Sequence, residues 1–315
     1  MYNEAQKKKF IESGDLTPSQ KRFATLLFNK TDKYEESLHT DLASMKVEDV
    51  ITMLGEMACM KLRSNIVYIL IVKKYINWCI DEKIPNVNYY IETIDINSLD
   101  VSAIKNKTVS SPLHLQQVLN MIFSTEDAKL VDNVFRMSCW LLYGGVLPKD
   151  LDKITTHDVD LTHMVVKYNG YEVPIYRECV PALLNCINLN GFVYPHPNYP
   201  DGFIKPRCCG DQLLRGFVPF SLRNFQNKLS AGQIKTSTSL NNLRLSAERI
   251  WLSGLFYTMY ENEVLGFKPD FRMAAAATYT GVSDSNSVEG MRALRNRRHA
   301  YNLDYKRWKI AYKYQ

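Results

Sequence analysis

The segment 140–184 constrains the fold more than any other part of this 315-residue chain. Within it, Asn169 and Gly170 separate two runs that are rich in valine and tyrosine. An Asn-Gly pair between β-prone runs is typical of a type I′ hairpin, in which both turn residues adopt a positive φ. Pro174 in the second run cannot donate a ladder hydrogen bond, so we expect that strand at a sheet edge. The segment therefore predicts one small antiparallel sheet.

Helices are expected on both sides of this hairpin. An apolar helix should end at Gly144-Gly145, because glycine readily adopts the left-handed conformation that terminates helices. A short helical turn then starts at Pro148, and a further helix starts near Pro181. The predicted order is helix, turn, hairpin, helix.

Helical periodicity dominates the N-terminal part of the chain. Apolar residues recur at helical spacing within 17–85, where Thr17-Pro18 is a start signal and a long helix is expected over 65–82. Residues 1–16 carry three consecutive lysines at 7–9 and are expected to form a mobile arm or a short helix. This basic arm either contacts phosphate or remains solvated, and the solvated state is favoured.

The rest of the chain contains one linker, several helices and one long loop. Residues 86–111 lose periodicity and gain polar residues, so a linker is placed at 91–111. Residues 189–210 contain four prolines and are predicted to form a long surface loop. The helices expected after the linker cover 113–123, 130–143, 217–232 and 243–260.

Composition narrows the class of protein. The length suggests two domains, and 39 Lys+Arg against 33 Asp+Glu give a net charge of +6, which is compatible with nucleic acid but weak by itself. The seven cysteines lack CxxC spacing and are expected to be reduced thiols, with zinc as the less favoured alternative. His157, His163 and His299 lack a metal-like arrangement, so we expect no metal and no cofactor. The longest apolar run, 66–72, is too short to span a bilayer, and a cytoplasmic protein without a membrane partner is expected.

The order of elements around the hairpin resembles the start of the catalytic domain of tyrosine recombinases (phage integrases). In that family the segment reads T-G-x-R-x-x-E-L, followed by an Asp-containing connection and a hairpin that ends in V-P-L. The corresponding stretches here are GGVLPKDL at 144–151, VDL at 159–161 and VPI at 173–175. The helices of 17–85 resemble the SAM-like core-binding domain that precedes the catalytic domain, with a generic helical bundle as the alternative.

This resemblance, which spans roughly residues 17–310, implies a fold class and a domain order. The expected fold is mainly α with a small β-hairpin sheet. A helical, SAM-like core-binding domain is expected over 1–90, the linker over 91–111, and an integrase-like catalytic-fold domain over 112–315. In recombinases, such a linker lets the two domains close around a duplex.

The resemblance also implies catalytic positions, and this chain departs from several of them. The first catalytic arginine of the family falls on Leu147. The second motif, H-x-x-R, aligns with 241–244, so Arg244 is retained while its histidine is replaced by Asn241. Two arginines bracket the scissile phosphate in active recombinases, and losing one such charge donor typically costs ~100–1000-fold in rate. A core-edge salt bridge is the other role open to Arg244. The hairpin lysine of the family matches Lys167 only loosely, because Lys167 precedes the turn.

The nucleophile has no clear counterpart. The glycine of the third motif falls on Gly281, which is followed by Val282, and no tyrosine stands at the usual spacing. Tyr305 is the best remaining candidate, although a tyrosine packed within a C-terminal helix is the favoured interpretation. We therefore expect no catalytic residues, with Arg244, Tyr305 and Lys167 as weak candidates.

Positive charge is concentrated near the C-terminus. Residues 292–313 contain eight Lys or Arg against Asp304, with tyrosines and Trp308 between them. This pattern suits phosphate contacts, and it equally suits packing on a neighbouring subunit or a solvated helix face. The candidate DNA-binding residues are Arg244, Lys167, Arg223, Lys228, Arg292, Arg295, Arg297, Arg298, Lys306 and Arg307.

Together these features predict a sequence-specific DNA-binding regulator on a catalytically inactive recombinase fold. In its departures the chain is similar to the integrase-like lysogeny repressors of SPβ-type prophages. The expected partner is double-stranded DNA, the expected location is the nucleoid of a bacterial host, and a homodimer or higher oligomer through the C-terminal segment is possible on this pattern. The alternatives are an active recombinase that uses Arg244 and Tyr305, or an architectural accessory factor for recombination.

Overall fold

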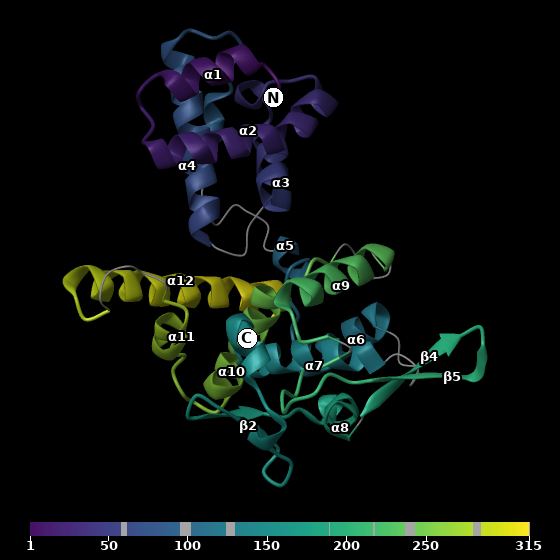
Figure 1. Cartoon of the computed structure of the whole chain (residues 1–315). Coiled ribbons are helices and arrows are strands. Elements are labelled where there is room, and N and C mark those ends of the chain that lie inside the picture. The colour runs from purple at the N-terminus through teal and green to yellow at the C-terminus, as the bar shows by residue number, and fades with distance from the viewer. Residues whose placement is uncertain are drawn as a thin grey trace. The chain divides into compact units, whose positions relative to one another are not determined.

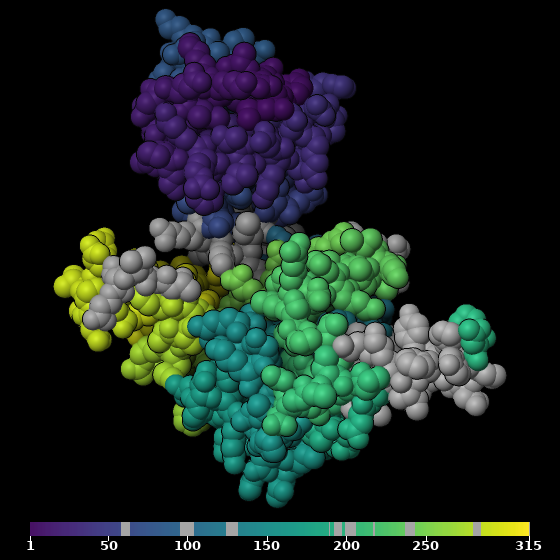
Figure 2. All heavy atoms as spheres, viewed as in Figure 1, coloured from purple at the N-terminus to yellow at the C-terminus, as the bar shows by residue number. Residues whose placement is uncertain are grey.

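The computed structural model describes residues 1–57, 62–94, 102–123, 130–188, 190–216, 218–236, 243–279 and 285–314. Contacts divide the chain into two compact units, which can be followed by residue number in Figures 1 and 2. Unit 1 contains Met1–Ile104 and Asp270–Gln315, and unit 2 contains Lys105–Pro269. The described part is mainly helical with two small antiparallel sheets, which confirms the predicted fold class. The domain boundaries given above remain a prediction.

Unit 1 is built from helices. They are α1 (Glu4–Glu12), α2 (Pro18–Leu38), α3 (Val47–Met57), α4 (Leu62–Asp81), α11 (Arg272–Ala277) and α12 (Val288–Tyr312), with 3-10 turns η1 (Leu42–Ser44) and η2 (Tyr89–Thr93). The short α5 (Ser102–Lys105) contains the boundary between the two units. Thr17 starts α2 as predicted: its hydroxyl accepts from the amide of Gln20, whose side chain accepts from the amide of Thr17. This capping box provides hydrogen-bond partners for backbone amides that have none within the helix. Pro18 in the first turn has no amide hydrogen and so needs no partner there.

An aromatic cluster forms the centre of the N-terminal helices of unit 1. Phe10 of α1 packs edge-on against Phe28 of α2 and Tyr75 of α4, with ring centroids 6.0 and 5.3 Å away. Trp78 stacks on Tyr75 at 6.2 Å. Burial of each such side chain contributes on the order of 1.5–3 kcal/mol, so this cluster accounts for much of the attachment of α1.

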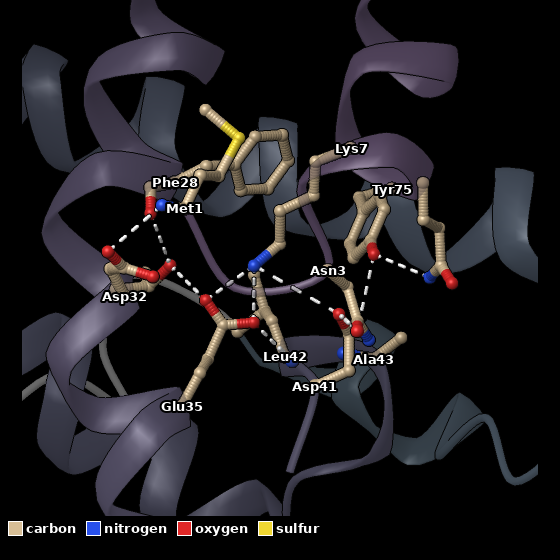
Figure 3. Close-up of polar contacts among 12 residues, drawn as sticks. Met1, Asn3, Lys7, Phe28, Asp32, Glu35, Asp41, Leu42, Ala43 and Tyr75 are labelled. Carbon is tan, nitrogen blue, oxygen red and sulfur yellow. Dashed lines mark hydrogen bonds and ion pairs between the residues drawn. The ribbon is translucent and has the colours of Figure 1, made fainter. Parts of the chain in front are cut away.

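A buried ion pair lies beside the aromatic cluster and joins α1 to α2 (Figure 3). Lys7 and Glu35 are both 0% exposed, and the Lys7 ammonium contacts both carboxylate oxygens of Glu35. Thr31 Oγ1 and the amide of Leu42 also donate to this carboxylate, at 2.7 and 2.8 Å. Burial nevertheless raises the pKa of Glu35 above its ordinary value. Residues 1–16 thus form a short helix as one alternative predicted, and the favoured solvated state is wrong for Lys7.

The same network continues through a second carboxylate. Asp41 lies 4.0 Å from the Lys7 ammonium and accepts hydrogen bonds from the Tyr75 hydroxyl and the Asn3 side chain, each at 3.0 Å. Because Tyr75 belongs to α4, the network connects three helices. Polar groups that are all paired in this way specify one arrangement of the helices, since any other would leave a charge buried without a partner.

Unit 2 is organised around the packing of α7 (Leu130–Gly144) on α10 (Ala247–Val264). Gly254 is required there, because a Cβ at this position would lie 1.7 Å from the Tyr143 carbonyl oxygen. Trp251 Nε1 donates to the Gly145 carbonyl at 3.1 Å just beyond the end of α7. The remaining helices of the unit are α6 (Pro112–Ile122), α8 (Val180–Asn188) and α9 (Leu222–Lys235), with 3-10 turns η4 (Pro148–Lys153), η5 (Thr156–Asp158) and η6 (Arg177–Cys179).

The predicted hairpin is present in unit 2. Strands β2 (Val165–Tyr168) and β3 (Tyr171–Pro174) pair antiparallel, and β1 (Val159–Asp160) pairs with the other side of β2. Asn169 and Gly170 have φ values of 50° and 80°, as a type I′ turn requires. The sheet order β1-β2-β3 places β3 and its Pro174 at an edge, which confirms that prediction.

The expected long loop over 189–210 is wrong. Strands β4 (Gly191–His196) and β5 (Tyr199–Pro206) form a two-stranded sheet there. Its register shifts between Tyr194 and His196, at Pro195. Proline is tolerated at bulges and in edge strands, and both strands of a two-stranded sheet are edges. The prolines therefore did not prevent strand formation, and the β-prone residues between them decided the outcome.

Lys7→Met is expected to lower the free energy of unfolding by about 3–5 kcal/mol, because it leaves the Glu35 carboxylate buried without its cation. The measurement is urea unfolding of the full chain. Lys8→Met is the matched control, since Lys8 is exposed and forms its ion pair with Glu4 on the same helix. Lys7→Met/Glu35→Gln should recover part of the loss. Equal effects of the Lys7 and Lys8 substitutions would contradict the buried pair.

Candidate nucleic-acid interface

Leu147 occupies the position at which the recombinase resemblance requires the first arginine. It is 8% exposed and caps the N-terminal end of η4, directly after the Gly144-Gly145 corner. An apolar side chain offers no hydrogen-bond donor to a phosphate. This part of the site therefore cannot supply the charge that an arginine would bring to a phosphoryl group.

The residues around Leu147 form a structural network. Asp150 is 3% exposed and accepts hydrogen bonds from the Tyr168 hydroxyl of β2 and from Lys153 Nζ at 2.6 Å. Burial acts to raise the pKa of Asp150, but these two hydrogen bonds, together with the positive charges of Lys153 and Lys149, hold the pKa below its ordinary value. Burial and the carboxylate of Asp150 raise the pKa of Tyr168. Asp150 thus stays ionised and ties η4 to the hairpin.

Lys167 lies on β2, exposed, two residues before the turn. Its ammonium is 3.9 Å from the Asp160 carboxylate, and Glu172 is its cross-strand partner on β3. Two neighbouring carboxylates offset the charge of Lys167. A contact between Lys167 and phosphate would have to compete with them.

Arg244 lies three residues before the start of α10, which begins at Ala247 with Ser246 as its cap. Its side chain is exposed, while its backbone is fixed on both sides. The Arg244 amide donates to the Asn106 carbonyl at 2.7 Å, and the Arg249 guanidinium donates to the Arg244 carbonyl. The exposed guanidinium of Arg244 therefore extends from a backbone that hydrogen bonds hold in place. Asn241, the position of the missing histidine, lies outside the described residues.

α10 links the two motif regions within unit 2. Trp251, seven residues after Arg244, donates to Gly145, two residues before Leu147. The close contact at Gly254 holds the same two segments together. The structure thus brings the segment of Arg244 close to that of Leu147, the two positions at which the resemblance leads us to expect arginines.

Tyr305 is enclosed in an aromatic cluster of unit 1. It is 2% exposed, stacks on Trp308 with centroids 6.2 Å apart and an interplanar angle of 20°, and lies 5.7 Å from the Phe271 ring. A hydroxyl in such a setting must leave the core before it can attack a phosphate. The packed role that the sequence favoured for Tyr305 fits this geometry. Gly281 and Val282, at the third motif, lie outside the described residues.

The basic residues of α12 differ in their surroundings. Arg292, Arg295 and Lys306 are exposed, and with His299 they recur at helical spacing along one face over about 21 Å. Arg298 is exposed and lies 3.6 Å from Asp270. The other two candidates on this helix are less available. Arg297 donates to the Thr278 carbonyl, while Arg307 is 9% exposed, and burial lowers its pKa against the opposing charge of Asp304.

On α9, Arg223 and Lys228 are exposed, and Lys228 lies 3.4 Å from Asp132. Three of the ten basic candidates therefore have an acidic neighbour that the sequence analysis missed: Lys167 with Asp160, Lys228 with Asp132, and Arg298 with Asp270. The last two pairs join residues far apart in the chain, so no local pattern could have revealed them. Arg223, Arg244, Arg292, Arg295 and Lys306 remain the exposed basic side chains best suited to an anion.

The described residues were also compared with the requirements of a membrane span and of a metal site. No helix among them is long and apolar enough to cross a bilayer. Nor do these residues bring three His, Cys, Asp or Glu side chains together in a way that could hold a metal ion.

Comparisons with known proteins match the chain to a family model and to solved structures. Residues 1–81 match the family described as MrpR, N-terminal core-binding domain, which confirms a helical core-binding domain at the N-terminus. No curated protein matches the chain. The Tn1549 transposon integrase (residues 82–397), solved in complex with circular intermediate DNA, is 12% identical over 92% of this chain and 97% of that chain, with a TM-score of 0.36.

Tyr168→Phe is expected to lower the free energy of unfolding by about 1–3 kcal/mol near neutral pH, because buried Asp150 loses a donor. The folded-state pKa of Asp150 is depressed, so its contribution is present above the unfolded pKa of about 3.9 and is lost as the pH falls through the folded value. The difference from the parent should therefore narrow in acid, as measured by urea unfolding at several pH values. Tyr171→Phe, at the exposed cross-strand partner of Tyr168, is the control and should leave the free energy of unfolding unchanged at each pH.

Proposed function

We propose that the chain is a sequence-specific DNA-binding regulator, of the kind that serves prophages as a lysogeny repressor, on a recombinase-like fold that no longer cuts DNA. The observation that carries this proposal is the buried Leu147 at the position of the first arginine. Without the positive charge of an arginine here, the negative charge that develops on the phosphate during cleavage is less stabilised. Loss of one such donor typically lowers the rate ~100–1000-fold. A chain that lacks this arginine but has exposed basic residues is better suited to binding DNA than to cutting it.

Phosphate contacts supply the affinity in this proposal. The exposed guanidinium of Arg244 and the basic face of α12 are the main contributors, since each is free of a close carboxylate among the described contacts. Arginine and lysine that neutralise phosphates release condensed counterions and fix the register of a protein on the duplex. The match of residues 1–81 to a core-binding domain supports the assignment of a DNA partner. Base readout by further side chains would supply sequence preference.

The C-terminal segment is proposed to support self-association as well. α12 buries Tyr305 and Trp308 on one side and exposes Ile310, with 63% of its surface accessible, on the other. A helix with an enclosed side and an exposed apolar residue beside basic ones can contact a second subunit. This oligomer belongs to the proposal and is separable from DNA binding by experiment.

A nicked suicide substrate is the test that separates a regulator from an active recombinase. We expect no covalent tyrosyl-DNA adduct, because Tyr305 is enclosed and the first arginine is absent. Operator duplex should bind ~10³–10⁷-fold more tightly than random duplex in the same buffer. An adduct that disappears in Tyr305→Phe would establish an enzyme. Equal binding of operator and random duplex would instead identify an architectural factor.

Arg244→Ala should weaken binding to specific and random duplexes alike, and should reduce the slope of log affinity against log salt by about one. Affinity is measured by fluorescence anisotropy between low and physiological salt. Lys8→Ala removes an exposed positive charge of unit 1 that already pairs with Glu4, so its slope should match the parent. An unchanged slope in Arg244→Ala would remove this residue from the interface.

A further inference from the structure

The segment that leads into α10, residues 243–246, has no regular secondary structure. Leu243 and Leu245 are each 5% exposed, whereas Arg244 between them is exposed. The side chains thus alternate between the core and solvent, and the two buried leucines hold Arg244 at the surface. Backbone polar groups that are buried outside a helix or sheet require other hydrogen-bond partners. The source of these partners determines how firmly the backbone of Arg244 is placed.

Gln233 of α9 supplies the partners of Leu245. Gln233 is 2% exposed; its Oε1 accepts from the Leu245 amide at 2.5 Å, and its Nε2 donates to the Leu245 carbonyl at 3.1 Å. Nε2 also donates to the Leu229 carbonyl at 3.2 Å, one turn back in α9. A backbone amide can only donate and a carbonyl can only accept, so the Gln233 carboxamide has one orientation and uses both of its N–H donors. It therefore binds the backbone of Leu245 as a neighbouring strand would.

Two other elements hold the same backbone. The Arg244 amide donates to the Asn106 carbonyl at 2.7 Å, and the Arg249 guanidinium of α10 donates to the Arg244 carbonyl. The segment of Asn106 is itself attached to α10, because the Val109 amide donates to Ser253 Oγ at 3.1 Å. Contacts from α9, from the segment before α6 and from α10 thus meet at one short stretch of chain.

The side chain of Arg244 has no such support. Among the described residues it forms no hydrogen bond or ion pair, so its location is set through its backbone. A group that is held in place before binding loses less conformational freedom when it binds, and this preorganisation strengthens the contact. Gln233 is suited to provide it, since it fixes the residue that directly follows Arg244.

We propose that Gln233 is a positioning residue for Arg244: it holds the backbone from which the guanidinium extends and so strengthens the contact of Arg244 with phosphate. This inference rests on the proposed function, in which Arg244 contacts DNA. Gln233 itself is too deeply buried to reach a duplex. The alternative is a role in stability alone, in which Gln233 only satisfies the buried backbone of Leu245. Binding by the folded protein would then not depend on Gln233.

A double-mutant cycle of Gln233→Met with Arg244→Ala provides the test. Methionine has a similar length but makes none of the three hydrogen bonds. Affinity for a random-sequence duplex is measured by fluorescence anisotropy at low salt, and thermal unfolding verifies that each variant is folded at the assay temperature. Gln233→Met should weaken binding about three- to tenfold in the parent, and by less than about twofold when residue 244 is already alanine. It should also lower the slope of log affinity against log salt toward that of Arg244→Ala.

Arg223→Ala is the control background. Arg223 is an exposed arginine on the same helix, ten residues before Gln233 and so about 15 Å away along the axis. Residues this far apart that share no partner act additively, so Gln233→Met should keep its full effect there. An effect that shrinks equally in the Arg223 and Arg244 backgrounds would indicate a general distortion of α9 and would overturn the proposal.

Gln233→Glu is a second variant, and it takes the place of Gln233→Met in the cycle if that variant does not fold. Its carboxyl oxygen still accepts from the Leu245 amide, but only its protonated form can donate to the Leu245 carbonyl. Because burial raises the pKa of a carboxyl group, the affinity of Gln233→Glu relative to the parent should rise as the pH is lowered from about 8 to about 6. This rise should be absent when residue 244 is alanine.

The outcomes separate this proposal from the proposed function. The positioning role is overturned if substitution of Gln233 leaves the affinity of the folded protein unchanged, or weakens it equally with and without Arg244. In both cases, weaker binding by Arg244→Ala would show that the phosphate contact of the proposed function still holds. If Arg244→Ala binds as the parent does, that contact is absent, and the positioning role fails together with it.

Discussion

The contact between Gly254 and the Tyr143 carbonyl determines how unit 2 is assembled. No other residue type allows α10 to approach α7 so closely, because any side chain would meet backbone. That approach places the indole of Trp251 on the Gly145 carbonyl and so brings the segment of Arg244 to that of Leu147. Of the two positions that α10 brings together, one carries an arginine and the other a leucine, so only Arg244 can offer a positive charge to an anion there.

The sequence predicted the elements whose cause is local. Asn169-Gly170 specified the turn, Pro174 the sheet edge, and Thr17-Pro18 the start of α2, since each acts through its own backbone or that of a near neighbour. Its error over 189–210 has a physical basis as well. Four prolines argue against strands inside a sheet, but a two-stranded sheet has only edges, where a missing amide hydrogen costs little.

The sequence could not predict which charges are enclosed. Lys7 and Lys8 are adjacent and chemically identical, yet only Lys7 faces the carboxylate of Glu35, 28 residues further along the chain. The acidic neighbours of Lys228 and Arg298 are similarly remote. Burial of Tyr305 depended on Phe271 and Trp308, and only the second of these shares its helix. Contacts between residues far apart in the chain thus determine which basic side chains are available to an anion. Fewer of them are available than the sequence alone indicated.

The outer edge of β3 has a consequence for how the protein tolerates high concentration. Open strand edges template the pairing of neighbouring chains and so promote aggregation. Here that edge ends in Pro174, which has no amide hydrogen to offer, and it carries the exposed carboxylate of Glu172. Backbone-to-backbone extension of the sheet from this edge is discouraged by both residues. Crowding of molecules on a surface or filament would then not extend this sheet from its β3 side.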